Sequence, residues 1–336
     1  MRKALGMFSL VCALVVLACA WEYARNGEIR FLTHANVRNV LSRVGLFGIL
    51  SLGQAIVIIS GGIDLSVGSI VGLTGIATAM LLNRGEGLDP AVALPVVLVL
   101  AGGIGAWHGL LITKARMQPF VVTLCGLFFY RGIARFIAGD ATQGFGTAFE
   151  RLRWLGRGFL PREGSLLPAP FCIFLLLACA AGAYLHFTAQ GRHLYALGAN
   201  EEAARYSGIR TDRIKILAYT LCSVTTAWGG MLMAFKVNSL GPSDFGSFYE
   251  LYAIAGVVLG GCSLRGGTGN VLGVVVGASL IVVLQNLVNI LEIPSQLEYV
   301  VIGGAILVGV CLDELVASGR SSRSLRGGLS RRSARR

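Results

Sequence analysis

A carboxylate and three hydroxyl groups interrupt an otherwise apolar stretch, GGIDLSVGSIVGLTG, at residues 61 to 75. The acidic residue is Asp64, and Ser66 and Ser69 follow it. An ionised carboxylate in hydrocarbon is costly unless it is hydrogen-bonded, paired or hydrated, so these residues predict a polar translocation path. The alternative is that Asp64 caps a helix, with Ser66 and Ser69 bonded back to that helix. Both interpretations hold if the cap lies at the edge of the path.

The two glycines before Asp64 predict a break between two helices. Gly61 and Gly62 end the apolar stretch 41–60, and a new helix can begin at Asp64, whose side chain accepts N–H groups of the first turn. Non-helical backbone at membrane depth is stable only where protein covers it or where it lines a polar cavity. Residues 260–265 are weakly similar in sequence to residues 61–66. Paired helix breaks of this kind are expected of a transporter built from repeats.

Three amide side chains form a second polar group late in the chain. Gln285, Asn286 and Asn289 share one side of an apolar stretch, because residues 285 and 289 are four apart. Amides donate and accept hydrogen bonds without charge, which suits a path for a hydroxyl-rich ligand. The alternative is that these amides only join neighbouring helices.

The composition indicates that membrane spans carry these groups. Of 336 residues, 54% are hydrophobic and 14% are charged, against about 25% charged in a soluble domain. We predict an all-α, polytopic membrane protein with about ten transmembrane helices, some of them broken, because apolar runs long enough to cross about 30 Å recur along the chain. The predicted spans are 4–21, 41–60, 63–82, 91–113, 119–138, 169–188, 216–236, 251–263, 271–290 and 297–313.

Glycine spacing predicts that these spans pack closely. The chain holds 46 glycines, and pairs four residues apart let two helix backbones approach each other. Such pairs are Gly68 with Gly72, Gly105 with Gly109, and Gly273 with Gly277.

Basic residues predict the orientation. The net charge of +12 comes from residues between and beyond the apolar runs, so it indicates topology and no nucleic-acid partner. Both termini are predicted to be cytoplasmic, with inner segments that hold Lys114, Arg116, the loop 190–215 and Arg265. We predict one transmembrane domain, 1–316, and a disordered basic cytoplasmic tail, 317–336, that lies on anionic membrane lipid.

The residue types that hold metals or nucleotides are scattered. The eight cysteines lie in or beside apolar runs without a C-x-x-C pair, and the four histidines do not cluster, so no metal site is expected. A phosphate-binding P-loop requires lysine directly after glycine, and none of the four lysines follows one. We therefore expect a chain that is not an enzyme and needs no cofactor, so that any ATP it uses is bound by another polypeptide.

The loop 190–215 contains the pattern of a short helix. Asn200 is a good N-cap, Glu201 and Glu202 occupy the first turn, where the helix dipole favours negative charge, and Gly208 is a natural left-handed stop. These residues predict a helix over 201–207, about 10 Å long, outside the bilayer. A helix this short must dock against another structure to be stable; the alternative is a solvated connector.

The same segment resembles a known docking motif. Glu202, Ala203 and Ala204, with Gly208 four positions further on, match the E-A-A-x-x-x-G loop by which permease subunits of bacterial ABC importers bind their ATPase. The resemblance implies that the residues which couple to the ATPase are Asn200, Glu201, Glu202, Ala203, Ala204, Arg205 and Gly208.

Three further stretches are similar to the ribose-type monosaccharide permeases of this class. They are SGGIDLSVGS at 60–69, GRHLYALGANEEAARYSGI at 191–209 and YELYAIAGVVLGGCSLRGGTG at 249–269, within a resemblance that covers about 36 to 313. The resemblance implies a ten-helix subunit with a vitamin-B12-importer-like fold in the bacterial inner membrane, translocating a monosaccharide by alternating access. It also implies three partners: a second permease copy, identical or related; two ABC ATPase chains or one fused tandem ATPase; and an extracytoplasmic sugar-binding protein.

Charged residues on the predicted outer side are candidates for docking or gating. Asp244 and Glu250 belong to a segment that resembles the family's outer gate region. The arginines of the outer loop are candidate contacts for an acidic surface of the binding protein; they are Arg151, Arg153, Arg157 and Arg162. Arg131 and Arg135 in the fifth span either reach lipid headgroups or line a vestibule.

Two other functions remain open. An ion-coupled secondary carrier would need no partner chains and would use Asp64 as its titrating group, but the docking motif argues against it. An ABC permease of the same fold that carries amino acids or nucleosides is the nearer alternative.

Overall fold

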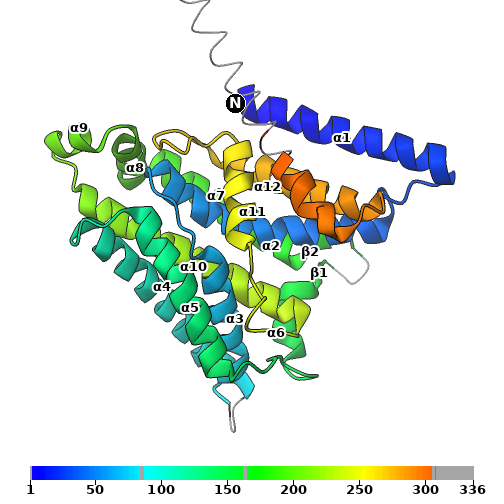
Figure 1. Ribbon diagram of the computed structural model, residues 1–336, viewed down its shortest axis with the longest axis horizontal. Helices are drawn as coiled ribbons and strands as arrows, with labels where there is room; N and C mark the ends of the chain where they lie inside the picture. Colours follow the sequence, from blue (N-terminus) through cyan, green and yellow to red (C-terminus); the bar gives the residue numbers. More distant parts are fainter. Residues whose placement is uncertain (1, 84–86, 162–164, 305–306, 308–336) are drawn as a thin grey trace, which may run out of the picture.

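The computed structural model describes residues 2–83, 87–161, 165–304 and 307, and this part of the chain is mostly helical (Figure 1). The predicted tail, 317–336, the domain boundary at residue 316 and Arg162 lie outside the described residues. The described helices are α1 (Arg2–Asn26), α2 (His34–Ile59), α3 (Val67–Asn83), α4 (Pro90–Thr113), α5 (Pro119–Ala138), α6 (Glu150–Arg157), α7 (Ala169–Phe187), α8 (Ala189–Ala199), α9 (Glu201–Tyr206), α10 (Thr211–Val237), α11 (Tyr249–Leu259) and α12 (Val271–Ile290). The strands β1 (Phe159–Leu160) and β2 (Leu167–Pro168) form a small antiparallel hairpin, and a 3-10 turn follows at Ser295–Leu297.

Seven of the described helices are long and apolar enough to cross a membrane, namely α1, α2, α4, α5, α7, α10 and α12. The apolar helices α3 and α11 are shorter, with 17 and 11 residues. Each of the first nine predicted spans therefore coincides with a helix. The predicted tenth, 297–313, begins with helical residues 298–304, and nearly all of its remainder lies outside the described residues. The chain is a helical, polytopic membrane protein.

The helix α2 forms the centre of the molecule. It is apolar around its whole circumference, and every residue from Val44 to Ile59 is buried. The helices α7, α10, α11 and α12 all pack against it, and α10 also packs against α3 and α4. The helix α1 lies along α12 at the edge of the molecule (Figure 1).

Glycines form the close contacts that their spacing predicted. A Cβ atom at Gly105 would lie 2.6 Å from Thr220 Cα of α10, and one at Gly109 would lie 2.5 Å from Ile216 Cα of the same helix. Gly277 of α12 meets the backbone of α11 in the same way, at Gly256 and Gly260. These helices approach so closely because no side chain separates their backbones.

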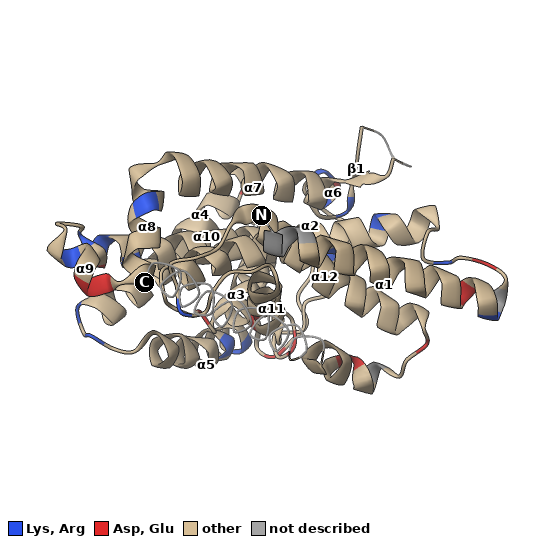
Figure 2. Ribbon diagram, turned by 90° about the horizontal axis from the view of Figure 1, so that it is seen from above, with Lys and Arg blue, Asp and Glu red and all other residues tan. Residues whose placement is uncertain are grey.

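Charged side chains gather at the two ends of the elongated molecule. Figure 2 shows α8 and α9 at one end, with basic and acidic residues around them, and α6 toward the other end. The helix α10 connects the two ends, since Lys215 near its start contacts α9 and Lys236 near its finish contacts α6. We call these the α9 end and the α6 end.

Candidate functional site

The predicted break between α2 and α3 is present. Gly61 has a φ of 86°, which favours glycine, and α3 begins at Val67 rather than at Asp64. Asp64 is fully buried, and its Oδ1 accepts hydrogen bonds from the N–H (2.8 Å) and the Oγ (2.6 Å) of Ser66. Ser69 Oγ donates to the Ser66 carbonyl at 2.8 Å. The carboxylate thus holds the turn that precedes α3, whereas the capping interpretation placed it at the first turn of the helix itself.

Polar side chains from neighbouring helices approach this turn. Gln54 of α2, with its amide nitrogen toward the Asp64 carbonyl, donates to that oxygen and accepts from the Asp64 N–H, both at 3.2 Å. Tyr219 of α10 donates to the Ile63 carbonyl at 3.5 Å. The backbone of the break therefore finds its partners in side chains of α2 and α10, as buried backbone requires.

Three polar atoms in this region have no hydrogen-bond partner among the described residues. They are Asp64 Oδ2, His108 Nδ1 and Ser223 Oγ, all buried. The other ring nitrogen of His108 bonds to Tyr130 at 2.8 Å. Unpaired buried polar atoms are costly, so this is a part of the interior suited to water or a polar solute. The role of Asp64, Ser66 and Ser69 in a path remains a prediction.

A second break, between α11 and α12, repeats the geometry of the first. Gly61 N donates to Ile58 O (2.9 Å) and Gly62 N to Val57 O (3.1 Å). Likewise Gly261 N donates to Val258 O (2.9 Å) and Cys262 N to Val257 O (3.1 Å), and Gly261 has a φ of 89°. The two breaks are thus 200 residues apart (261 minus 61), one more than the letters of the sequence suggested.

The two breaks meet each other and the end of α8. Gly267 N donates to Ile59 O at 2.9 Å, and a Cβ atom at Gly266 would lie 2.8 Å from Gly61 Cα. A Cβ atom at Gly198 would collide with Ile59 O and Gly267 N. Three backbone segments therefore pack without intervening side chains.

Replacing Gly198 with alanine is expected to destabilise the permease. The added methyl group must displace backbone on two sides, and such overpacking costs about 1–3 kcal/mol. We expect a lower melting temperature of the purified protein in detergent. The measurement is the loss of the folded peak in size-exclusion chromatography after heating. The matched control is Gly103→Ala, since nothing lies within 4 Å of a Cβ atom at Gly103. Equal melting temperatures for the two variants would contradict the close contact.

The predicted short helix is present as α9. Asn200 Oδ1 accepts from Ala203 N–H at 3.0 Å, and Gly208 has a φ of 82°. The preceding helix α8 was missed by the sequence analysis, although its N-cap is readable: Thr188 Oγ1 accepts from Gly191 N–H at 3.0 Å. The α9 end thus presents a pair of capped helices.

One side of α9 is anchored and the other is exposed. Ala204 is buried, and Glu201 pairs with Lys215 of α10 at 2.6 Å and with Arg205 at 3.2 Å. The exposed residues are Glu202, Ala203, Arg205, Tyr206, Ser207 and Gly208, with Tyr206 91% exposed. The helix is therefore docked on the protein, as its shortness required, and it offers a face to a partner.

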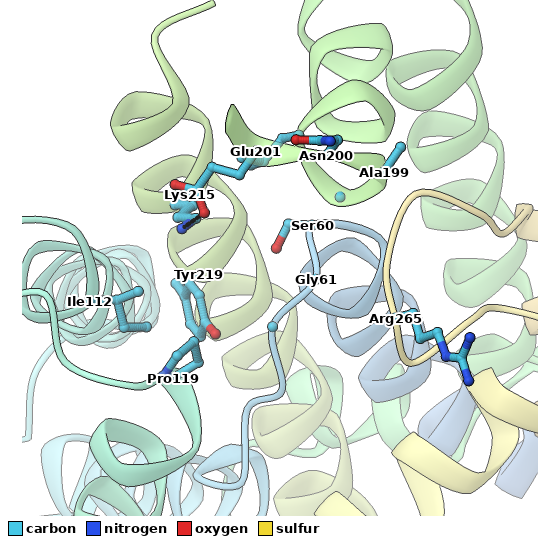
Figure 3. A pocket seen from close by; sticks show the side chains of 13 residues that line it. Ser60, Gly61, Ile112, Pro119, Ala199, Asn200, Glu201, Lys215, Tyr219 and Arg265 are labelled. Atoms are coloured by element: carbon cyan, nitrogen blue, oxygen red, sulfur yellow. Dashed lines mark hydrogen bonds and ion pairs between the residues drawn. The ribbon is translucent and has the colours of Figure 1, made fainter. Parts of the chain in front are cut away.

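A pocket of about 280 Å³ lies between α9 and the two breaks (Figure 3). Its lining includes Gly61 and Gly62 of the first break, Arg265 of the second, and the ion pair of Glu201 with Lys215. Figure 3 shows Tyr219 between Ile112 and Gly61, where its ring closes the pocket on the side of the first break. The pocket is thus adjacent to the buried Asp64 turn.

The amide group lies elsewhere in the molecule, toward the α6 end. Gln285 is buried, accepts from Arg43 Nη2 at 2.9 Å and donates to Glu298 Oε1 at 3.1 Å. Asn286 exchanges two hydrogen bonds with Asn36 of α2, at 3.0 and 2.8 Å, as expected of a contact that joins two helices. The exposed Asn289 donates to the Gln285 carbonyl at 3.0 Å. Within the described residues, no hydrogen bond joins these amides to Asp64.

The outer arginines differ in accessibility. Arg151 is exposed, whereas Arg153 is 7% exposed and donates to the Gly146 carbonyl at 3.0 Å. Arg157 forms an ion pair with Glu150. Of the three described arginines proposed for docking, Arg151 is therefore the most available to a partner.

Glu250, a candidate for the outer gate, is buried in the protein. It is 7% exposed, and its carboxylate accepts a hydrogen bond from the backbone of Gly68, at the start of α3. A negative charge at this position stabilises α3 through the helix dipole. The helix α11 begins at Tyr249, one residue before Glu250. Asp244 is exposed, and its role in an outer gate remains a prediction.

The segment 238–248 before α11 is held by Arg131. Its Nη1 donates to the Phe245 carbonyl at 2.6 Å, while Arg135 pairs with Asp140 at 2.7 Å. Of the two arginines, Arg131 therefore faces the protein.

No group of three His, Cys, Asp or Glu residues in the described part of the chain could hold a metal ion.

Comparison with known proteins decides the family. The family model described as branched-chain amino acid transport system / permease component matches residues 36–310. The chain belongs to this permease family. The permease is 36% identical to the ribose import permease protein RbsC of Escherichia coli (strain K12), over 91% of its own length and 92% of the relative's.

Two further relatives are similar over comparable lengths. The ribose import permease protein RbsC of Bacillus subtilis (strain 168) is 36% identical, over 92% of this chain and 91% of the relative. The xylose transport system permease protein XylH of Escherichia coli (strain K12) is 29% identical, over 92% of each chain. No solved structure matches. The relatives are named as permeases, in agreement with a transport subunit that is not itself an ATPase.

Proposed function

We propose that this permease is the transmembrane subunit of an ABC importer that carries a monosaccharide across the bacterial inner membrane. Ribose and xylose are the substrates named for its relatives, so a pentose is the first candidate and a hexose the second. The observation that carries the proposal is α9, a capped helix that is anchored by Lys215 and exposes Glu202 and Ala203. The exposed side of α9 provides a surface to which a separate ATPase can bind.

In the proposed mechanism, force enters at α9. Closure of the ATPase on ATP pulls the exposed face of α9, and the packing of Gly198 on Ile59 and Gly267 passes the displacement to both helix breaks. Broken helices at two symmetric positions are typical of transporters that alternate between inward-open and outward-open states. In this mechanism, backbone contacts within the permease connect the ATPase-binding helix α9 to the predicted translocation path.

The proposed assembly contains two permease copies, two ABC ATPase chains or one fused tandem ATPase, and a sugar-binding protein outside the membrane. The α9 end is cytoplasmic in this proposal, because Lys114, Lys215 and Arg265 lie there together. The proposal further includes two cytoplasmic termini and ten spans in a vitamin-B12-importer-like fold. ATP is bound by the partner, and the permease requires no cofactor of its own.

Two alternatives have support of their own. The description of the matching family model names branched-chain amino acids, so a permease for amino acids is the nearer one. An ion-coupled carrier draws its support from the buried, half-paired Asp64. It leaves the exposed face of α9 without a role.

Reconstitution in proteoliposomes tests the proposal. The permease is combined with its ATPase and with the binding protein, and the ligand of the binding protein is first identified by a thermal-shift screen of sugars and amino acids. We expect sugar-loaded binding protein to stimulate ATP hydrolysis and to support uptake. Stimulation by an amino acid alone would favour the alternative substrate, and uptake by the permease alone would favour the ion-coupled carrier.

A further inference from the structure

A chain of charged and polar side chains connects four helices near the α6 end. Lys236 Nζ of α10 donates to Ser42 Oγ of α2 at 2.7 Å. The next residue of α2, Arg43, donates to Gln285 of α12, and Gln285 donates to Glu298. The hydroxyl of Tyr252 of α11 lies 3.5 Å from the same Glu298 oxygen. We call these six residues the outer polar cluster.

The outer polar cluster holds two cations that lack an ion pair within the described residues, Arg43 and Lys236. Both carry positive charge, so they repel each other, and Arg43 is connected to the carboxylate of Glu298 through the amide of Gln285. Arg43 and Lys236 are both half-buried in helices long and apolar enough to cross a membrane. Ionisable residues in such helices face the interior of the bundle or a water-filled cavity, because lipid cannot solvate them.

Aromatic rings lie beside these polar groups. The ring of Phe47 is 5.0 Å from that of Tyr249 and 5.8 Å from that of Tyr252, edge to face in both cases. Small-molecule sites in proteins combine an aromatic wall with a few placed donors and acceptors. A sugar ring fits this combination, since its C–H face can pack on aromatic carbon and its hydroxyls can both donate and accept.

The cluster also flanks the segment 238–248. Lys236 precedes this segment by two residues, and Tyr249 and Tyr252 follow it. The segment is fixed to α5 by Arg131, and Glu250 is fixed to the start of α3. Any movement of this segment therefore shifts groups of the outer polar cluster against one another.

We propose that the outer polar cluster is the sugar-recognition site of the permease. Arg43 and Lys236 donate hydrogen bonds to adjacent hydroxyls of the sugar, Glu298 accepts one, and the ring packs against Phe47 and Tyr252. This assignment rests on the proposed function, because it requires a hydroxyl-rich substrate. It places recognition at Arg43, Lys236 and Glu298, which the sequence analysis did not single out, and keeps Gln285 as the amide that joins them.

Uptake of D-ribose and D-xylose by the reconstituted complex provides the first test. We expect Arg43→Gln and Lys236→Met to lower uptake about 10-fold to 100-fold, as for loss of a charged hydrogen bond, while the ATPase still co-purifies with the permease. Lys236→Arg should restore most of the uptake, and Glu298→Gln should change the ratio of the two sugars. Arg135→Gln, which removes an exposed cation outside the cluster, is the matched control and should behave as the unsubstituted permease.

Cysteine labelling provides a second test that does not depend on uptake. We expect Arg43→Cys to react with a membrane-impermeant thiol reagent faster than the unsubstituted permease, and binding protein loaded with ribose or xylose should slow the reaction. Absence of labelling in every nucleotide state would overturn the proposal, as would labelling that a transported sugar does not slow. If the unsubstituted complex transports no sugar that its binding protein binds, the proposed function fails on that result, while the labelling still decides whether the cluster lines a path.

Discussion

Replacing Glu202 with lysine is expected to abolish most uptake while the permease stays folded. Glu202 is exposed on α9 and forms no ion pair within the described residues, so its carboxylate is available to a partner. Reversing its charge places a cation where the partner ATPase is expected to favour an anion, and unfavourable charge contacts at an interface cost several kcal/mol. We expect transport to fall roughly 5-fold to 150-fold, the range of a coupling free energy of about 1–3 kcal/mol.

The measurement is uptake and stimulated ATPase activity of the reconstituted complex, with co-purification of the ATPase as a second readout. Glu28→Lys is the matched control, because Glu28 is an exposed acid in the loop after α1, and Figure 1 shows the end of α1 across the molecule from α9. Its melting temperature and uptake should equal those of the unsubstituted protein. If Glu202→Lys transports normally and retains its ATPase, the exposed face of α9 is not the contact.

Substitutions of Asp64 are expected to separate capping from ion coupling. Asp64→Leu removes the acceptor of the Ser66 N–H and Oγ groups and leaves both buried without a partner. Each unpaired group costs about 1–3 kcal/mol, so we expect a large fall in melting temperature and little correctly assembled protein. Asp64→Asn keeps an oxygen that can accept from Ser66 N–H, and asparagine caps helices about as well as aspartate, so stability should change little.

Transport by the Asp64→Asn variant is the decisive measurement. We expect uptake within a few-fold of the unsubstituted complex, still driven by ATP and unaffected by an ionophore. Loss of uptake by an assembled, thermally stable Asp64→Asn complex would show that the charge itself is needed. An ion-coupled mechanism would then replace the capping role.

The two polar groups of the permease lie in different parts of the fold. The Asp64 turn is beside the pocket at the α9 end, whereas Gln285 is near the α6 end with Arg43 and Glu298. A path that used both would begin at the outer polar cluster and end near Tyr219. The sequence analysis joined these residues into one path on chemical grounds alone, and their separation along the molecule is the refinement that the structure adds.

Local patterns sufficed to predict much of this protein. Apolar runs located nine of the described helices, because a span must satisfy its backbone hydrogen bonds within itself whatever its neighbours are. The break at Gly61, the N-cap at Asn200 and the stop at Gly208 were predicted because each depends on the conformational preferences of a few adjacent residues.

Only the tertiary structure determined which distant residues meet. No sequence pattern predicts that the carboxylate of Glu250 lies at the start of α3, which begins at Val67. No sequence pattern predicts the contact of Gly198 with Ile59 and Gly267 either. Arg43 and Lys236 are single cations in predicted spans, a signal that could have marked them, but their approach to Gln285 and Ser42 follows from the packing of α2, α10 and α12. Periodicity specifies which face of a helix is apolar, whereas the partner of that face depends on how all the helices pack together.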